Sequence, residues 1–132
     1  MSDATEFLRS SMPFTALLDL RVVSESSREV VTTTSWSEDR CTVGGVLHGG
    51  FLLGCIDATG GLAAFHNLPA GAVGTSTIES KTNFLRGVRG GDITVTARPV
   101  HTGRTTVVLD ITVTDDQGRA VTKTLQTQAV LS

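Results

Sequence analysis

The hydrophobic and polar positions of this chain follow the two-residue period of β-strands in most segments. Alternation is clearest over 105–114, where Val107, Leu109, Ile111 and Val113 face one way. Dense β-branched residues predict another strand over 30–36. The remaining strands are expected at 21–25, 72–85, 92–100 and 120–131, with a turn at Gly103-Arg104 and a hairpin loop at 115–118.

A helical period replaces this alternation between Gly49 and about His66. The segment is apolar nearly all round, so we expect the rest of the chain to wrap it. A shorter helical region, interrupted near Pro13, is expected over 3–18. These elements predict a single α+β domain over 1–132, in which an antiparallel sheet packs one face against a central helix.

One acid interrupts the apolar helix, on a face that is otherwise glycine. Gly50, Gly54, Asp57 and Gly61 are spaced by four, three and four residues and therefore share that face. Each glycine in a helix costs about 1 kcal/mol relative to alanine, so the pattern indicates a close approach by a second helix copy or a substrate. A tight packing seam around a structural acid is the alternative. An ionised Asp57 could attack a carbonyl or take a proton from water.

The helix begins at Val46-Leu47-His48-Gly49-Gly50. The first N–H groups of a helix have no partner within it and lie at its positive end. We therefore expect Gly49 and Gly50 to offer donors to a developing oxyanion, although the glycines could merely permit a tight turn. His48 either has a functional role, in which it orients a substrate carbonyl or holds the loop before the helix, or it simply caps the helix.

The composition of the chain argues against several classes of binding partner. The net charge is −2, and 39% of the residues are hydrophobic and 18% charged, which is typical of a globular protein and argues against nucleic acid. No stretch resembles a signal peptide or membrane span, so we expect a cytoplasmic protein without a membrane partner. The spacing of Cys41 and Cys55 predicts no metal site, and neither a serine-hydrolase elbow nor a phosphate loop is present.

The His-Gly-Gly run, the acid nine residues after the histidine, and two later motifs together carry a family resemblance. The later motifs are Asn83-Phe84-Leu85-Arg86 and His101-Thr102-Gly103-Arg104. From about Phe14 to Leu131 the chain resembles the hotdog-fold acyl-CoA thioesterases of the phenylacetate-degradation (PaaI-like) group. The resemblance implies a strongly curved antiparallel sheet wrapped around the long helix. It also implies homodimers, assembling to homotetramers, whose sites lie between two subunits.

The resemblance implies a role for each matching residue. Asp57 matches the catalytic acid, either nucleophile or general base, and Gly49 matches the N–H that polarises the thioester carbonyl, supported by His48. Ser76 falls where some relatives place a hydroxyl that holds the attacking water. No cofactor is implied beyond the coenzyme A moiety of the substrate. The residues expected to bind substrate or coenzyme A are Gly50, Asn83, Phe84, Arg86, Gly103 and Arg104.

Two positions depart from the family pattern. Thr42 stands six residues before the histidine, where relatives commonly carry Asn or Gln, and a hydroxyl cannot bridge as an amide does. Gly61 stands where some relatives carry Ser or Thr. The sequence therefore predicts an acyl-CoA thioesterase, with a non-catalytic acyl-CoA-binding protein as the alternative. A hydratase-like lyase is disfavoured because His48 and Asp57 are too far apart in sequence, and a purely structural role leaves the acid unexplained.

Overall fold

The computed structural model describes all 132 residues of the chain. Each predicted strand and both predicted helical regions are present, with boundaries within about two residues of those expected from the sequence. A short 3-10 helix over Glu38–Arg40 follows the strand predicted at 30–36. The elements are α1 (Asp3–Ser11), α2 (Phe14–Leu17), β1 (Arg21–Glu25), β2 (Val30–Ser35), α3 (Gly49–Phe65), β3 (Gly74–Phe84), β4 (Asp92–Thr102), β5 (Thr106–Thr114) and β6 (Ala120–Leu131).

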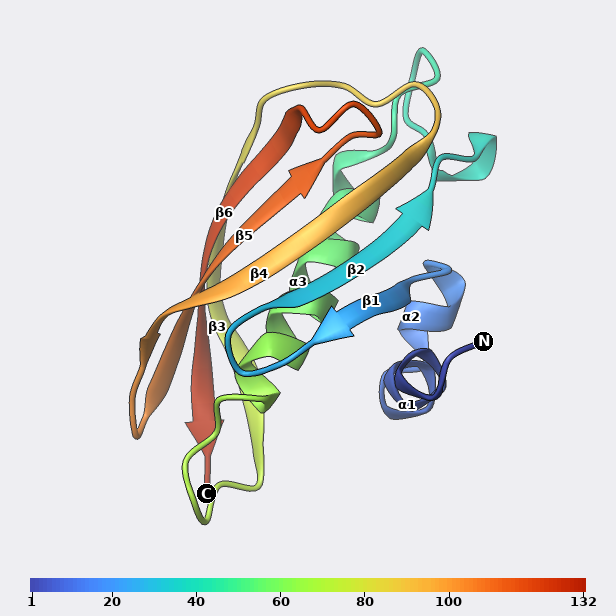
Figure 1. Cartoon of the computed structure of the whole chain (residues 1–132). Helices are drawn as coiled ribbons and strands as arrows, with labels where there is room; N and C mark the ends of the chain where they lie inside the picture. The colour runs from blue at the N-terminus through green and yellow to red at the C-terminus, as the bar shows by residue number, and fades with distance from the viewer.

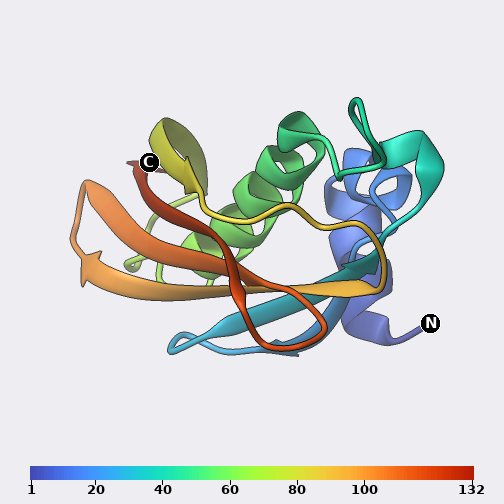
Figure 2. The same ribbon diagram turned by 90° about the horizontal axis from the view of Figure 1, so that it is seen from above.

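Six strands form one sheet in the order β1-β2-β4-β5-β6-β3, and every neighbouring pair is antiparallel. The sheet curves around α3, which lies along its concave face (Figures 1 and 2). The predicted fold class is thereby confirmed. The eleven-residue strand β3 lies at one edge of the sheet, so one side of its backbone has no strand partner.

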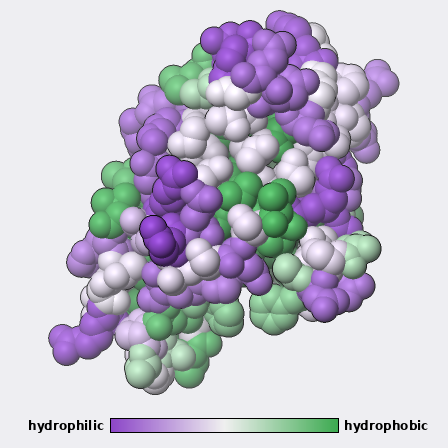
Figure 3. All heavy atoms as spheres, viewed as in Figure 1, coloured by the Kyte–Doolittle hydropathy of each residue, from purple (hydrophilic) through white to green (hydrophobic).

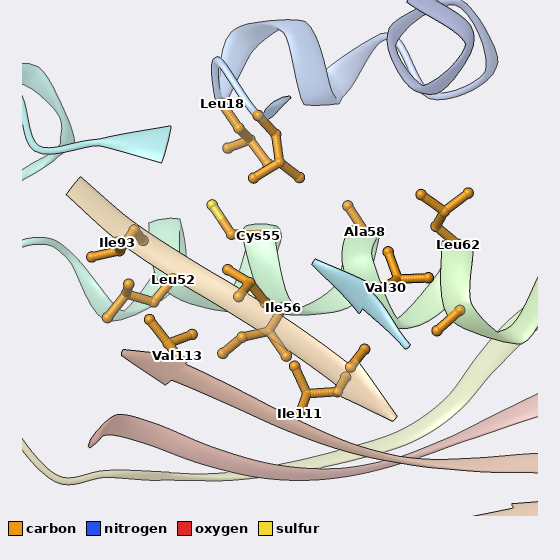
Figure 4. Close-up of a cluster of buried hydrophobic side chains, with 14 of the residues drawn as sticks. Leu18, Val30, Leu52, Cys55, Ile56, Ala58, Leu62, Ile93, Ile111 and Val113 are labelled. Atoms are coloured by element: carbon orange, nitrogen blue, oxygen red, sulfur yellow. The ribbon is translucent and has the colours of Figure 1, made fainter. Parts of the chain in front are cut away.

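The core lies between α3 and the concave face of the sheet. Alternate residues of β5 are fully buried, which explains its strict period, and α3 contributes the side chains that meet them (Figure 4). Figure 4 also shows Leu18 approaching the opposite side of α3, near Cys55 and Ala58. The buried core side chains that α3 and β5 contribute include Leu52, Cys55, Ile56, Leu62, Val107, Leu109, Ile111 and Val113.

The wrapping of α3 is incomplete, contrary to the expectation from its composition. Gly50, Leu53, Asp57 and Phe65 are exposed along one side, which we call the open stripe of α3. Gly54, on the same glycine-rich face, is covered within the chain, since a Cβ there would lie 3.2 Å from the Phe14 ring of α2. The sheet and α2 together leave uncovered only the stripe that carries the acid.

A β-bulge interrupts the pairing of β3 with β6. Thr77 pairs with Gln128 and Glu79 with Thr127, so Ile78 is the extra residue. The bulge changes the parity of the strand, and Thr77 and Ser80 consequently both lie on the side that faces α3. Bulges of this kind re-aim side chains, and this one adjoins the helical acid.

The outer face of the sheet is mostly polar. In Figure 3, which views it as in Figure 1, hydrophilic residues cover most of the surface and hydrophobic residues form separate patches. The outward positions of β5 include Thr106, Asp110, Thr112 and Thr114, in agreement with this view. No helix of the chain has both the length and the apolar character needed to cross a membrane.

Candidate active site at Asp57 and the start of α3

His48 caps α3. The side-chain Nδ1 of His48 accepts a hydrogen bond from the Gly50 N–H at 2.7 Å. The backbone N–H of His48 donates to the Arg40 carbonyl at 2.9 Å. The neutral ring must then carry its proton on Nε2. The capping role considered from the sequence is therefore present. The expectation of a free donor at Gly50 is wrong, because His48 occupies that N–H.

Gly49 supplies a free donor. It is the first residue of α3, so its N–H has no partner within the helix, and the backbone and side-chain hydrogen bonds of the chain include none from it. The Phe84 ring of β3 covers this turn, and a Cβ on Gly49 would lie 3.3 Å from it. An N–H at the positive end of a 17-residue helix is suited to binding a carbonyl oxygen that gains negative charge.

Asp57 lies two turns further along α3 and is exposed in the single chain. Its Oδ1 accepts two hydrogen bonds, from Thr77 Oγ1 at 2.7 Å and from Gln126 Nε2 at 3.1 Å. No group of the chain donates to Oδ2. One carboxylate oxygen is therefore held by the protein while the other is left for a reactant.

Two glutamines of β6 stand behind this carboxylate. Gln126 and Gln128 have exposed fractions of 0% and 1%. Gln128 Nε2 donates to Thr77 Oγ1 at 2.6 Å and to Gln126 Oε1 at 2.8 Å, and Thr75 Oγ1 donates to Gln128 Oε1 at 3.0 Å. Asp57 is thus the last acceptor in a series of hydrogen bonds that begins at side chains of the sheet.

The sequence reasoning did not find Thr77, Gln126 or Gln128. A signal was available, because Thr122, Thr124, Gln126 and Gln128 alternate along β6 and so share one face. That face is buried, although it is polar throughout. A buried polar stripe requires hydrogen-bond partners, and two of them are Asp57 and Thr77.

Asp57 borders a pocket of about 410 Å³ between α1, α3 and β3. Its apolar wall comes from α1 and the end of α3, where the Phe7 and Phe65 rings lie 6.3 Å apart. Gly61 opens onto the same space, since a Cβ there would meet nothing within 4 Å. The lining residues are Phe7, Leu8, Ser11, Met12, Asp57, Gly61, Leu62, Phe65, Thr75, Ser76, Thr77 and Gln128.

Ser76 lines this pocket and is exposed, but its hydroxyl makes no hydrogen bond within the chain. The neighbouring Thr77 contacts the acid instead. The predicted role of Ser76 in holding water stays a prediction.

Asp57 and the Gly49 N–H are far apart within one chain. At 1.5 Å per helical residue, the eight residues from 49 to 57 span about 12 Å. Thr42 belongs to the Gly49 end, because its N–H bonds to Val46 in the turn that precedes α3. A thioester carbonyl could therefore not contact Asp57 and Gly49 of the same protomer at once.

The predicted coenzyme A residues also divide into two groups. Phe84 and Arg86 line a second pocket, of about 420 Å³, with Gly49, and the exposed Asn83 precedes them on β3. The exposed Arg104 and the partly exposed Gly103 lie at the other end of the sheet. Phe84 pairs with Thr122, whereas Thr105 bonds to Val130, about 27 Å further along β6.

Arginines gather near the first of these groups. Arg86 and Arg89 line an adjoining pocket of about 530 Å³, together with Arg119, which pairs with Asp115 at 2.8 Å. Arg89 donates to the Gly44 carbonyl at 2.8 Å, while the Arg86 side chain makes no hydrogen bond in the chain. The free guanidinium group of Arg86 suits phosphate.

Cys55, the other nucleophilic side chain of α3, is not placed for catalysis. Burial raises the pKa of its thiol to about 12, against the opposing charge of Arg40. A thiol with that pKa is protonated and unreactive near neutral pH. No three His, Cys, Asp or Glu side chains of the chain form a group that could hold a metal ion.

Comparisons of this chain with known proteins agree on one family. The sequence model of the thioesterase superfamily matches residues 44–122. The protein SSO2140 of Saccharolobus solfataricus, whose name gives it provisionally as an esterase, is 32% identical over 114 residues, which are 86% of this chain and 80% of that protein.

Solved structures agree in fold. A mutant of thioesterase PA1618 from Pseudomonas aeruginosa superposes with a TM-score of 0.89 at 27% identity, covering 99% of this chain and 96% of that one. A hypothetical thioesterase of Streptococcus pneumoniae TIGR4, in a structure with coenzyme A, gives a TM-score of 0.83 at 27% identity, covering 94% and 97%.

Proposed function

This chain belongs to the thioesterase superfamily and is a hydrolase, and we propose that its substrate is an acyl-coenzyme A thioester. The Streptococcus pneumoniae relative with coenzyme A supports this substrate class, as do the arginines beside the start of α3. The nine-residue separation of His48 and Asp57 supports membership of the PaaI-like group within the superfamily.

The observation that carries the proposal is the asymmetric carboxylate of Asp57. Thr77 and Gln126 hold Oδ1, and Oδ2 is free beside a pocket with an apolar wall. In a hydrolase this is the arrangement of a nucleophile or general base whose orientation is fixed. The apolar acyl group would occupy the 410 Å³ pocket, with its carbonyl near Oδ2.

The proposed site is shared by two protomers. About 12 Å separates Asp57 from Gly49 in one chain, so the oxyanion donor must come from a second copy. Two uncovered features suit such a partner, namely the open stripe of α3 and the unpaired edge of β3, where Ile78 is 63% exposed. We propose a homodimer, which assembles further into a homotetramer as in the family resemblance.

In the proposed reaction, the thioester oxygen of an acyl-CoA binds the Gly49 N–H of one protomer. Asp57 Oδ2 of the other protomer either takes a proton from water, which then attacks the carbonyl carbon, or attacks that carbon directly. The C–S bond breaks, and the coenzyme A thiolate leaves and is protonated by solvent. In the direct route, water then hydrolyses the acyl-aspartyl anhydride. The products are the free acid and coenzyme A, and the proposal requires no cofactor.

The coenzyme A arm would extend from the start of α3 along the pocket lined by Phe84 and Arg86, toward Arg89. Gly103 and Arg104, at the opposite end of the sheet, could reach the same molecule only from another protomer. Their predicted role therefore depends on the proposed assembly.

The test is release of free thiol from a panel of phenylacetyl-, short-chain and long-chain acyl-CoAs. We expect turnover by the wild type and a loss of about 1,000-fold or more in kcat for Asp57→Asn, which keeps the volume but removes the reacting carboxylate. Asp92→Asn is the matched control, since Asp92 is also an exposed acid but bonds to Ser35 at the start of β4. Equal rates for Asp57→Asn and the wild type would end the mechanism, and binding without any turnover would end the catalytic assignment.

A further inference from the structure

We propose that Gln126 is a positioning residue of the hydrolase, which acts through Asp57 by fixing its Oδ1 and thereby presenting Oδ2 to the substrate. This inference rests on the proposed function, in which Asp57 is the reacting group. Gln126 is buried on β6 and is not exposed to the pocket space, so it acts on the substrate only through the carboxylate.

The direction of each hydrogen bond supports this role. Gln126 Nε2 donates one proton to Asp57 Oδ1 at 3.1 Å and the other to Ser80 Oγ at 3.3 Å. Its Oε1 accepts from Gln128 Nε2 at 2.8 Å. The opposite amide orientation would place a carbonyl oxygen against the carboxylate, and two acceptors cannot bond. The contacts of Gln126 therefore define one orientation.

The second donor to Asp57 depends on the same chain of bonds. Thr77 has a single hydroxyl proton, which it gives to Asp57, and its oxygen accepts from Gln128 at 2.6 Å. The Thr75 hydroxyl lies within hydrogen-bond distance of two acceptors, Gln128 Oε1 at 3.0 Å and the Ala129 carbonyl at 2.9 Å. Thr77 and Gln126 each give Asp57 one proton, and Gln128 donates to both of these residues, an arrangement suited to a carboxylate that only accepts.

Two local features accommodate the side-chain amide of Gln126. Gly60 faces Gln126 so closely that any Cβ there would overlap Oε1. On the other side, the bulge at Ile78 places both Thr77 and Ser80 on the inner face of β3, where they meet Gln128 and Gln126. Buried amides are costly unless they are fully hydrogen-bonded, and here all four polar atoms of the two glutamines are bonded.

The experiment compares Gln126→Met, which keeps the length of the side chain but removes the amide, with the wild type on the best substrate of the panel. We expect kcat to fall by about 10- to 100-fold with KM changed by less than about threefold, because displacement of a reacting group by about 1 Å can cost about 100-fold. Thr122→Val is the matched control. It alters the same buried face of β6 at a hydroxyl that has no hydrogen-bond partner, and kcat should not change.

A double-mutant cycle separates positioning from a general structural effect. In the Asp57→Asn background, Gln126→Met should lower the residual kcat by no more than about twofold, since the group through which it acts is already gone. A full additional loss in that background would overturn the proposal. Thr77→Val, a conservative change on an edge strand, provides a second variant with an expected loss of about 10-fold in kcat.

Crystal structures of the wild type and Gln126→Met test the inference without turnover. We expect the Asp57 carboxylate to leave its position beside Thr77 in the variant, and an unmoved carboxylate would overturn the positioning role. If the wild type hydrolyses no acyl-CoA, the proposed function fails. The carboxylate position in the two structures still decides whether Gln126 holds Asp57.

Discussion

Gly60 of α3 lies directly against the buried amide of Gln126, and their closeness links the packing of the helix to the position of the acid. A Cβ on Gly60 would overlap Oε1 of Gln126 and would come within 2.8 Å of Cδ1 of Ile111. The amide of the same glutamine donates to Asp57. The adjacent Gly61 has no such constraint, because a Cβ there would meet nothing within 4 Å.

The two glycines should respond oppositely to alanine. Gly60→Ala should lower the free energy of unfolding by about 1–3 kcal/mol, because overpacking outweighs the gain in helix propensity. Gly61→Ala should raise it by up to about 1 kcal/mol. Urea unfolding of both variants and the wild type provides the measurement. A Gly60→Ala protein as stable as Gly61→Ala would show that Gln126 does not pack as described.

The Gly49 N–H can be removed without removing the helix start. Proline is favoured at the first position of a helix, and His48, with φ −64° and ψ 136°, already has a conformation that precedes proline well. Gly49→Pro should lower kcat by about 100- to 1,000-fold by deleting one oxyanion donor. Gly49→Ala is the control, since it places a Cβ near Phe84 but keeps the N–H. Similar rates for the two variants would exclude the N–H from catalysis.

Mixing two inactive variants tests the shared site. A dimer of one Asp57→Asn chain and one Gly49→Pro chain contains one site in which both groups are intact, if each site takes Asp57 from one protomer and Gly49 from the other. Random exchange of subunits should then restore about a quarter of the wild-type activity. The measurement is thiol release after subunit exchange, with each variant alone as the control. No recovery in dimers shown to be mixed would contradict a site between protomers.

Asp115 should make stability depend on pH at the hairpin between β5 and β6. The backbone N–H of Arg119 lowers the pKa of Asp115 below its ordinary value of 3.8; the Arg119 side chain and the Gln117 N–H act in the same direction, while burial opposes them. The stabilisation is therefore present above pH 3.8 and is lost as pH falls through the lowered pKa.

The corresponding measurement is urea unfolding of Asp115→Asn and the wild type at pH values from about 7 down to about 2. The variant should be less stable at pH 7, and the difference should shrink as the pH falls below 3.8. Asp116→Asn is the control, because the neighbouring exposed carboxylate makes no hydrogen bond within the chain. A difference that stays constant with pH would show that the ionised carboxylate is not the source.

Local periodicity was sufficient for the elements of the fold. The alternation over 105–114 produced β5, and the change to a helical period at Gly49 produced α3, because each depends on residues only a few positions apart. Asp57 and the start of α3 at His48-Gly49 could also be recognised, because they too depend on residues only a few positions apart. The polar face of β6 could not be assigned to the interior, since alternation indicates that Gln126 and Gln128 share a face but not which face is buried.

The pattern of residues was enough to predict which segments are strands and helices, that Asp57 shares a helix face with glycines, and that His48 and Gly49 stand at the start of α3. That β3 is an edge strand and that Asp57 is bonded to Gln126 became known only from the packing of the strands around the helix. Asp57 and Gln126 are 69 positions apart, and their hydrogen bond depends on the order of strands around the helix. Short-range patterns of polarity do not specify that order, because the same alternation suits any position in the sheet.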